Sequence, residues 1–489
     1  MLHDLAGNPI HAYNLVERLV THLPVIILEL AKDDTKAVIA EKISHLMKGN
    51  EIPNKNDLEG VTQALVRIQF AYHLDPREMA SGMIRDVQTE GRLSAHQMMN
   101  IAESRVSGDQ PLRPGIGKEY ALAIEWAEGA LALVEDDGSN TEMEERIKRL
   151  LTETKLEHNQ HWRSPVGQRG NYPNEEFFVR KVDQDKITTG QELRREEAAY
   201  LREYSITGYL RQGWNIHDFY SLCRGETVSH TMVTTKQYCQ LTTKNNPYFY
   251  LAPLRQEIVS EDPLVQLYHD ILTEGEIHFL TTKILDQLAA ASVQDTNKYD
   301  GAGTKISNER TQSNGWLWDD LEDDILYKLS KKTGKLVDLE TTRPEKELSD
   351  MIESEPLQLG LYGSGGHYLP HYDTFDPKQE PPDVWGKDGT WVGRRIATVM
   401  FYLNDLIGEN TAFPKLGLSI TPRKGTAVFW YNLDKNFRRD VLSLHGACPT
   451  ALGIKWVANK WIREGAQIWK KPCAKKRSWR AWFQELVPS

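Results

Sequence analysis

Residues 360–373 read GLYGSGGHYLPHYD, and the spacing within this stretch is the most informative in the chain. His371 and Asp373 lie two residues apart, so on a β-strand both side chains would project from the same face. An imidazole beside a carboxylate provides two ligands of a 2-His-1-carboxylate facial triad, which suits non-haem Fe(II) and leaves coordination positions open. The pair occurs often by chance, so the prediction depends on residues further along.

A third ligand and a cation follow in a fitting order. His445 lies in LSLHGACP (442–449), and Lys455 stands ten residues beyond it. A lysine on the strand after His445 can hold the far carboxylate of a dicarboxylic acid, while the near end chelates the metal. The order His-x-Asp, His, Lys therefore indicates an iron site with a dicarboxylic acid beside it and one position left for O2.

The sequence around these residues is typical of β-strands. RIATVMFYLND (395–405) and GTAVFWYNL (425–433) are rich in β-branched and aromatic residues, and TPRKG (421–425) between them is turn material. From about Asn246 onward, short apolar runs alternate with Gly, Pro and Asn. This texture predicts a sandwich or jelly roll, with a helical segment over 269–288 before it.

The N-terminal half is predicted to be helical. Leu15, Leu19 and Leu23 repeat at four-residue spacing, and KEYALAIEWAEGALALVED (118–136) has an apolar helical face. Pro24 and Pro53 are predicted to break helices. The helix pairs beyond residue 100 are similar to tetratricopeptide repeats, without a clean repeat of roughly 34 residues. We therefore expect an α+β multidomain chain with a helical N-terminal half and a β-rich C-terminal half.

The composition of the 489 residues excludes several classes of protein. Lys and Arg total 59 against 69 Asp and Glu, and a net charge of −10 disfavours general nucleic-acid binding. The apolar stretch Leu23–Leu30 is far shorter than the roughly 20 residues that span a membrane. We expect neither a nucleic-acid partner nor a membrane anchor. The N-terminal residues also lack the basic and apolar regions of a signal peptide.

Four cysteines fall in two separated pairs, Cys223 with Cys239 and Cys448 with Cys473. None has the C-x-x-C spacing of a redox motif or zinc ribbon. Four reduced thiols in a cytosolic protein and two disulfides in an oxidising compartment fit the composition equally well.

Taken together, these segments resemble the α subunit of collagen prolyl 4-hydroxylase, in the Fe(II)/2-oxoglutarate dioxygenase superfamily. The resemblance is carried by YGSGGHYLPHYD, RIATVMFYLND, PRKGTAVFWYNL, HGACP and KWVANKW, with GNPIHAYNLVERL, LVRIQFAYHLD and LCRGE nearer the N-terminus. It implies a helical dimerisation-like domain over 1–100, a degenerate tetratricopeptide-like peptide-binding domain over 101–215, a double-stranded β-helix (jelly-roll) dioxygenase domain over 216–475, and a basic tail over 476–489.

The resemblance also implies roles for individual residues. His371, Asp373 and His445 match the iron ligands, and Lys455 matches the residue that binds the distal carboxylate of 2-oxoglutarate. Residues expected around the co-substrate are Tyr362, Thr398, Tyr402 and Asn459, and those expected to contact the peptide are Arg395 and Trp461. For the aromatic residues, core packing is an equally good interpretation. One departure stands at GENTAFP (408–414), where the family usually has a Gly-Gly pair before its T-x-F-P segment.

As a member of this family the chain would be a procollagen-proline 4-dioxygenase of the endoplasmic reticulum lumen, using Fe(II), 2-oxoglutarate, O2 and L-ascorbate. Its disulfides would be Cys223–Cys239 and Cys448–Cys473, and its partners procollagen-like peptide and protein disulfide isomerase, in an α2β2 tetramer. Two alternatives remain open. The central segment has lost much of the repeat pattern, which would fit a dioxygenase for non-collagen proline-rich peptides, and a catalytically silent scaffold could use the helical half alone.

Overall fold

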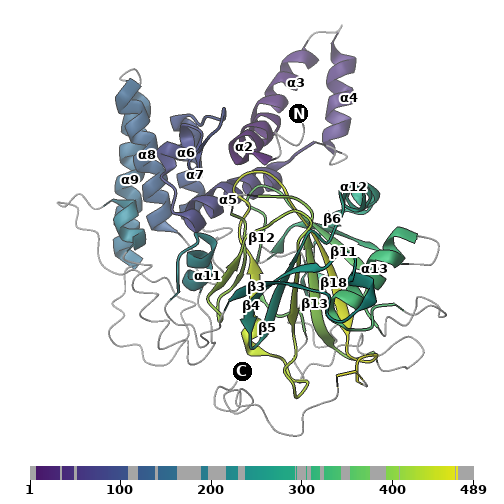
Figure 1. The fold of residues 1–489 in the computed structure, drawn as a ribbon. Coiled ribbons are helices and arrows are strands. Elements are labelled where there is room, and N and C mark those ends of the chain that lie inside the picture. Colours follow the sequence, from purple (N-terminus) through teal and green to yellow (C-terminus); the bar gives the residue numbers. More distant parts are fainter. Residues whose placement is uncertain are drawn as a thin grey trace. The chain divides into compact units, whose positions relative to one another are not determined.

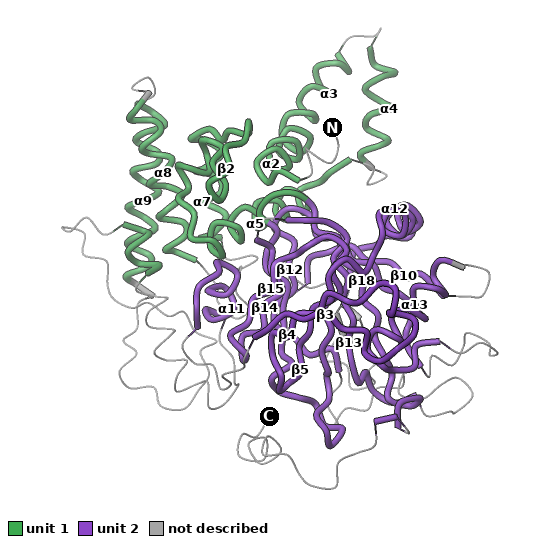
Figure 2. Tube along the Cα trace, viewed as in Figure 1, with its two compact units in different colours: residues 1–207, 451–453 green, residues 208–450, 454–489 purple. Residues whose placement is uncertain are grey.

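The computed structural model describes residues 7–32, 36–48, 52–107, 119–137, 141–161, 189–195, 216–228, 237–291, 293–294, 304–305, 310–319, 324–342, 353–374, 392–406, 408–468 and 470–471. The chain divides into two compact units, residues 1–207 with 451–453 and residues 208–450 with 454–489 (Figure 2). The first unit is helical and the second holds the large sheets, which confirms the predicted fold class. The division at residue 100 stays a prediction, and the predicted tail over 476–489 lies outside the described residues.

Several helices of the first unit begin where the sequence supplies a capping side chain. Asn8 accepts hydrogen bonds from the backbone at the start of the first helix, and Asn54 forms a capping box with Asp57 just after Pro53. The elements are α2 (Pro9–Glu17), the π-helical η1 (Arg18–His22), α3 (Leu23–Ala31), α4 (Ala37–Lys48), α5 (Lys55–Tyr72), α6 (Pro76–Ala80), the hairpin β1 (Met83–Ile84) and β2 (Val87–Gln88), α7 (Ala95–Ser107), α8 (Tyr120–Asp137) and α9 (Thr141–His161) (Figure 1).

The predicted break at Pro24 is wrong. The chain passes from α2 through the π-helical turn of η1 directly into α3, and Pro24 lies in the first turn of α3. In a regular α-helix a proline at this point would lack the N–H for the bond to the preceding turn, and its ring would clash with the carbonyl four residues back. The extra residue in the π-helical turn then lets the chain continue as a helix.

Two antiparallel sheets form the second unit. The nine-stranded sheet has the order β3 (Tyr238–Thr242), β4 (Leu254–Glu261), β5 (Leu264–His269), β16 (Ala427–Tyr431), β13 (Arg395–Tyr402), β18 (Lys455–Arg463), β11 (Leu357–Tyr362), β10 (Ser313–Leu317) and β6 (Ala289–Ala290). The five-stranded sheet has the order β15 (Leu418–Ile420), β14 (Thr411–Phe413), β17 (His445–Ala447), β12 (His367–His371) and β9 (Arg310–Thr311). A small pair, β7 (Val293–Gln294) and β8 (Thr304–Lys305), lies apart from both. This is the architecture of a double-stranded β-helix.

Strand β13 shows how the larger sheet is covered on both faces. Val399 and Phe401 belong to an apolar cluster that also takes in residues of α12 (Glu274–Lys283) and α13 (Asp324–Val337). Met400 and Tyr402 belong to a second cluster shared with the five-stranded sheet. Successive strand residues face opposite sides, so helices cover one face and the smaller sheet covers the other. The second cluster lies where the two sheets meet.

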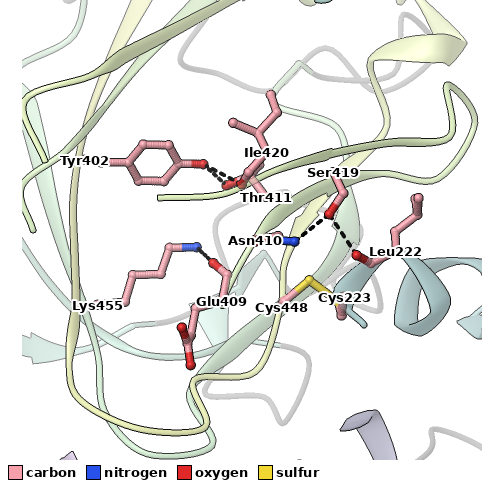
Figure 3. Close-up of a disulfide and its surroundings, with 10 residues drawn as sticks. All are labelled: Leu222, Cys223, Tyr402, Glu409, Asn410, Thr411, Ser419, Ile420, Cys448 and Lys455. Atoms are coloured by element: carbon pink, nitrogen blue, oxygen red, sulfur yellow. Dashed lines mark hydrogen bonds between the residues drawn. A yellow bond between two sulfur atoms is a disulfide. The ribbon is translucent and has the colours of Figure 1, made fainter. Parts of the chain in front are cut away.

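A disulfide joins α11 (Ile216–Cys223) to the residue after β17, and both predicted pairings are wrong. Cys223 bonds to Cys448 across 225 residues (Figure 3). Cys239 is free and exposed on the edge strand β3. Closure of the smaller sheet brings the end of β17 against α11. Cys239 is near Cys223 in the sequence but lies on the edge strand of the larger sheet. Cys473 lies outside the described residues.

Hydrogen bonds accompany this disulfide. The hydroxyl of Ser419 on β15 donates to the carbonyl of Leu222, at 2.7 Å, and accepts from the amide of Asn410, also at 2.7 Å. The backbone N–H of Cys448 donates to the carbonyl of Asn410 at 2.9 Å. Helix α11 is therefore fixed to the five-stranded sheet by covalent and polar contacts together.

We expect the Cys223→Ser and Cys448→Ser variants to lose the same stability, about 2–5 kcal/mol, because each breaks the same long cross-link. Combining the two substitutions should cost no more than either alone. Thermal melting of the three variants measures this, with Cys239→Ser as the control that keeps the wild-type melting temperature. A Cys223–Cys239 peptide in a non-reducing digest would contradict the pairing.

Candidate active site

Two neighbouring strands of the five-stranded sheet bring the predicted metal ligands together. His371 ends β12, and it lies directly opposite His445, which begins β17. Asp373 follows two residues later, with its carboxylate oxygens 3.5 Å from His371 Nε2 and 3.6 Å from His445 Nε2. One ligand atom from each residue lies within 4.8 Å of the others. Among the described residues, this is the only such cluster of potential metal ligands.

Close packing around Gly446 lets the ligand strand lie where it does. A Cβ atom at this position would approach Phe219 of α11 to 2.8 Å and the carbonyl oxygen of Tyr368 on β12 to 2.9 Å. Only glycine leaves room for the helix and the neighbouring strand to pack against β17 beside His445.

Each histidine is oriented by a backbone carbonyl. Nδ1 of His371 lies 2.8 Å from the carbonyl oxygen of Leu369, and Nδ1 of His445 lies 2.9 Å from that of Ser443. A carbonyl can only accept, so both rings carry a proton on Nδ1, and Nε2 is the ring nitrogen that lies toward Asp373. Burial lowers the pKa of His445 to about 4, so its imidazole is neutral near pH 7 and able to bind a metal.

Asp373 is buried and held by two donors. The hydroxyl of Thr398 donates to Oδ2 at 2.8 Å, and the indole N–H of Trp461 donates to the same oxygen at 2.9 Å. Burial alone would raise the pKa of Asp373, but His445 and His371 hold it well below its usual range. The residue is therefore a carboxylate, and the donor set of two imidazoles and one carboxylate fits Fe(II).

Cross-strand neighbours in the larger sheet support the ligands from one side. Thr398 on β13 lies opposite Trp430 on β16 and opposite Trp461 on β18. The ring of Trp430 packs against His445 with centroids 4.7 Å apart. This row of three residues therefore contacts two of the three ligands.

Arg395 is engaged within the protein. Its guanidinium makes two hydrogen bonds to the buried carboxylate of Glu355, at 2.6 and 2.8 Å, and lies 3.7 Å above the ring of Trp461. Arg463 contacts the same carboxylate at 2.9 Å. Contact of Arg395 or Trp461 with a peptide stays a prediction. In the structure, Arg395 contacts the backbone carbonyl of Asp373, and Trp461 donates to its carboxylate.

Lys455 begins β18, opposite Tyr362, and is 1% exposed. Its ammonium group donates to the carbonyl oxygen of Glu409 at 2.6 Å and lies 5.7 Å from the ring centroids of Tyr362 and Tyr402 (Figure 3). Burial lowers the pKa of Lys455 to about 7. No carboxylate among the described residues forms an ion pair with it, which is unusual for a buried lysine.

The loop that begins at Gly408, where the sequence departs from the family pattern, supports Lys455. Gly408 and Glu409 both adopt left-handed backbone, with φ of 91° and 51°. Glycine adopts this region without strain, which gives a physical reason for a Gly-Gly pattern at this turn. Here a glutamate takes the second position and still presents its carbonyl oxygen to Lys455.

A cavity of about 180 Å³ contains the metal ligands and Lys455. Four of the other predicted residues, Tyr362, Arg395, Asn459 and Trp461, line it as well. Thr398 and Tyr402 do not: Thr398 binds Asp373, and the phenol of Tyr402 donates to Thr411 at 2.7 Å. Lining residues that the sequence did not predict are Arg310, Trp316, Gln358, Tyr368, Tyr372, Met400, Thr411, Trp430, Gly446, Ala447 and Val457.

Strand alternation would have found some of these residues. Counting in twos along β18 from Lys455 gives Val457, Asn459 and Trp461, and all three line the cavity. Arg310 and Trp316 lie on β9 and β10, whose neighbours in the sheets are not readable from a single sequence.

Both halves of this chain contain a segment that matches a known protein family. Residues 2–86 match the family described as the prolyl 4-hydroxylase alpha-subunit N-terminal region, and residues 357–463 match the 2OG-Fe(II) oxygenase superfamily. Prolyl 4-hydroxylase subunit alpha-1 of Mus musculus is 31% identical over 483 residues, covering 96% of this chain and 84% of the relative. Prolyl 4-hydroxylase subunit alpha-2 of Caenorhabditis elegans is 28% identical, covering 96% and 83%.

The chain belongs to the prolyl 4-hydroxylase α-subunit family. It is accordingly a dioxygenase that depends on Fe(II) and 2-oxoglutarate, and the His-Asp-His cluster could hold its metal. A solved viral collagen prolyl hydroxylase from Paramecium Bursaria Chlorella virus-1, in complex with 2-oxoglutarate, aligns with 24% identity over 41% of this chain and 95% of its own, with a TM-score of 0.29. No described helix is both long and apolar enough to cross a membrane.

We expect Asp373→Ala to weaken Fe(II) binding by more than about 100-fold, beyond the effect of losing a supporting hydrogen bond, because two imidazoles alone would remain. Anaerobic titration of Fe(II) into the apoprotein measures the dissociation constant. Asp270→Ala, which removes an exposed carboxylate from the same unit, is the control and should bind iron normally. Wild-type iron affinity or normal turnover in Asp373→Ala would refute the assignment.

Proposed function

We propose that the chain is a procollagen-proline 4-dioxygenase, which hydroxylates proline in X-Pro-Gly sequences while 2-oxoglutarate is converted to succinate and CO2. The observation that carries the proposal is the presence, in one cavity, of a metal-ligand cluster and a buried lysine that forms no ion pair among the described residues. A metal held by the cluster would bind one end of a dicarboxylate co-substrate, and the lysine would bind the other.

His371, Asp373 and His445 would hold the iron. When bound, Fe(II) together with 2-oxoglutarate and O2 supplies the oxidant that replaces a hydrogen on proline C4 by hydroxyl. The protein contributes position: carbonyl oxygens fix both imidazoles, and Thr398 and Trp461 fix the carboxylate. L-ascorbate would keep the iron in its ferrous state.

Lys455 would bind the distal carboxylate of 2-oxoglutarate. Its ammonium group is buried between the rings of Tyr362 and Tyr402, where little water competes and a charge-assisted pair is strong. Asn459, four residues further along β18 and on the same face, also lines the cavity. Thr398 and Tyr402 would not contact the co-substrate themselves. They would act through their hydrogen bonds to Asp373 and Thr411.

Lys455→Ala should raise the 2-oxoglutarate requirement at least tenfold and leave the iron requirement nearly unchanged, because the lysine contacts no metal ligand. Steady-state turnover with each component varied in turn measures both. Lys424→Ala, which removes a lysine that pairs with Glu274 at the surface, is the matched control. An equal rise in both requirements would contradict this assignment.

The affinity for 2-oxoglutarate should also fall as pH rises above about 7. Burial lowers the pKa of Lys455 to about 7, so above that pH the empty site holds a neutral amine, and binding a carboxylate must first take up a proton. We expect a loss approaching tenfold per pH unit up to about pH 9, measured by calorimetry with Fe(II) replaced by Mn(II). In Lys455→Arg, whose guanidinium stays charged, the dependence should disappear.

Aromatic side chains form the part of the cavity wall beside the ligands. Tyr368 stacks on His371 with centroids 3.5 Å apart, and Trp316 packs near Trp461 at 5.7 Å. Tyr372 lies between the two ligands in the sequence and lines the same cavity. Flat aromatic faces suit the proline ring of a peptide, so Trp461 and its neighbours are the surface on which we place the substrate.

Turnover should therefore depend on peptide. With Fe(II), 2-oxoglutarate and ascorbate, a (Pro-Pro-Gly) repeat peptide should stimulate succinate release, and mass spectrometry should find 4-hydroxyproline. A proline-rich peptide without glycine serves as the comparison. Stronger stimulation by that peptide would favour the non-collagen alternative, and no turnover by folded, iron-loaded protein would favour the scaffold.

The family resemblance also supports an assembly. We propose pairing of two α chains through the N-terminal helices, protein disulfide isomerase as the β subunit of an α2β2 tetramer, and action in the endoplasmic reticulum lumen. Exposed apolar side chains gather on α3 and α4: Val25, Ile26, Leu28, Val38 and Ile39 are 52–66% exposed. Such a surface is typical of a protein–protein interface.

Leu28→Glu combined with Val38→Glu should shift the protein toward half its assembled mass, because charges would replace apolar contacts at the interface. Analytical ultracentrifugation of the co-expressed complex measures this. Lys42→Glu changes the charge of α4 at an exposed position without removing an apolar group, and should leave the mass unchanged. Unaltered mass in the double variant would place the interface elsewhere.

A further inference from the structure

We propose that Asn432 is a positioning residue for the iron site, which acts through Thr398 to orient the carboxylate of Asp373. The inference rests on the assignment of Asp373 as an iron ligand in the proposed function. It concerns a residue that lies outside the cavity lining and contacts no metal ligand directly.

The backbone of Asn432 is fixed just beyond the end of β16. Its N–H donates to the carbonyl oxygen of Ile396 at 2.8 Å, and its own carbonyl accepts from the N–H of Asp440 at 2.9 Å. The residue is fully buried. Its side-chain amide donates to the hydroxyl oxygen of Thr398 at 2.9 Å, and that hydroxyl donates to Asp373 Oδ2 at 2.8 Å.

The direction of these two bonds follows from the charge of Asp373. An ionised carboxylate has no proton to give, so the single proton of the Thr398 hydroxyl must point toward Oδ2. The hydroxyl oxygen can then only accept in its other bond. Asn432 must therefore present its NH2 group, and by occupying that lone pair it holds the hydroxyl in the donating orientation.

The result bears on the orientation of the Asp373 carboxylate. Thr398 and Trp461 both donate to Oδ2, which lies 3.6 Å from Nε2 of His445, while Oδ1 lies 3.5 Å from Nε2 of His371. Two donors on one oxygen restrain the rotation of the carboxylate. Asn432 supports one of them and contacts neither Trp461 nor the ligands.

The other half of the Asn432 amide makes the test specific. Its Oδ1 atom is buried and has no hydrogen-bond partner in the described part of the chain. Replacing Asn432 by leucine, which has nearly the same shape, therefore removes the single side-chain hydrogen bond to Thr398 and leaves no stranded donor behind.

A double-mutant cycle on Fe(II) affinity tests the relay. Thr398→Val, Asn432→Leu and the double variant are titrated with Fe(II) anaerobically, with 2-oxoglutarate present and no peptide. We expect Thr398→Val to weaken binding about tenfold, as losses next to a metal ligand do, and Asn432→Leu to weaken it by a smaller factor. The double variant should match Thr398→Val alone, because Asn432 acts only through that hydroxyl. Thr398→Ser should restore near wild-type affinity.

Two comparisons separate positioning from general destabilisation. Thr333→Val removes another buried hydroxyl of the same unit, one that donates to the carbonyl of Leu329, and should lower the melting temperature without changing iron affinity. Trp461→Phe removes the independent donor to Asp373, so its loss and that of Asn432→Leu should multiply. If Thr398→Val does not fold, Thr398→Ala takes its place in the cycle.

The proposal is overturned if Asn432→Leu leaves iron affinity unchanged, or if it weakens binding by the same factor with and without the Thr398 hydroxyl. Either result would leave the iron assignment standing. Wild-type iron affinity in Asp373→Ala would instead overturn the assignment of the ligand, and the relay with it.

Discussion

The site depends on the pairing of β12 with β17. Because His371 lies opposite His445 in this register, two imidazoles that are far apart in sequence share one face, and the chain needs only two further residues to place Asp373 between them. A slip of one residue would turn one imidazole to the other face of the sheet. The close packing at Gly446 and the disulfide at Cys448 both involve β17 or the residue that follows it, so both help to hold this pair of strands.

The positions of protons and charges on the three ligands follow from the groups around them. Backbone carbonyls require protons on Nδ1 of both histidines, burial keeps His445 neutral, and hydroxyl and indole donors bind Oδ2 of Asp373. In the same cavity, Lys455 is buried without an ion pair among the described residues, and burial lowers its pKa to about 7. Below that pH the lysine carries the charge that an anion requires.

Sequence reasoning identified what has a local signature. The His-x-Asp pair, the third histidine and the lysine were readable because strand periodicity and chain order limit where such side chains can meet. The class of each half was readable from apolar spacing. The pairing of Cys223 with Cys448 was not, because it depends on how the smaller sheet closes, and the same holds for Arg310 and Trp316 in the cavity wall. The continuation of the helix past Pro24 needed a π-helical turn that leaves no sequence signal.

The separation of the disulfide-bonded cysteines also constrains the order of events during synthesis. Cys223 and Cys239 leave the ribosome long before Cys448 exists, so the native bond can form only when nearly the whole catalytic unit has been made. Any bond formed earlier between the first two cysteines must be exchanged afterwards, by attack of a thiolate on that disulfide. A chain that ends before Cys448 therefore cannot form the bond that joins α11 to the end of β17.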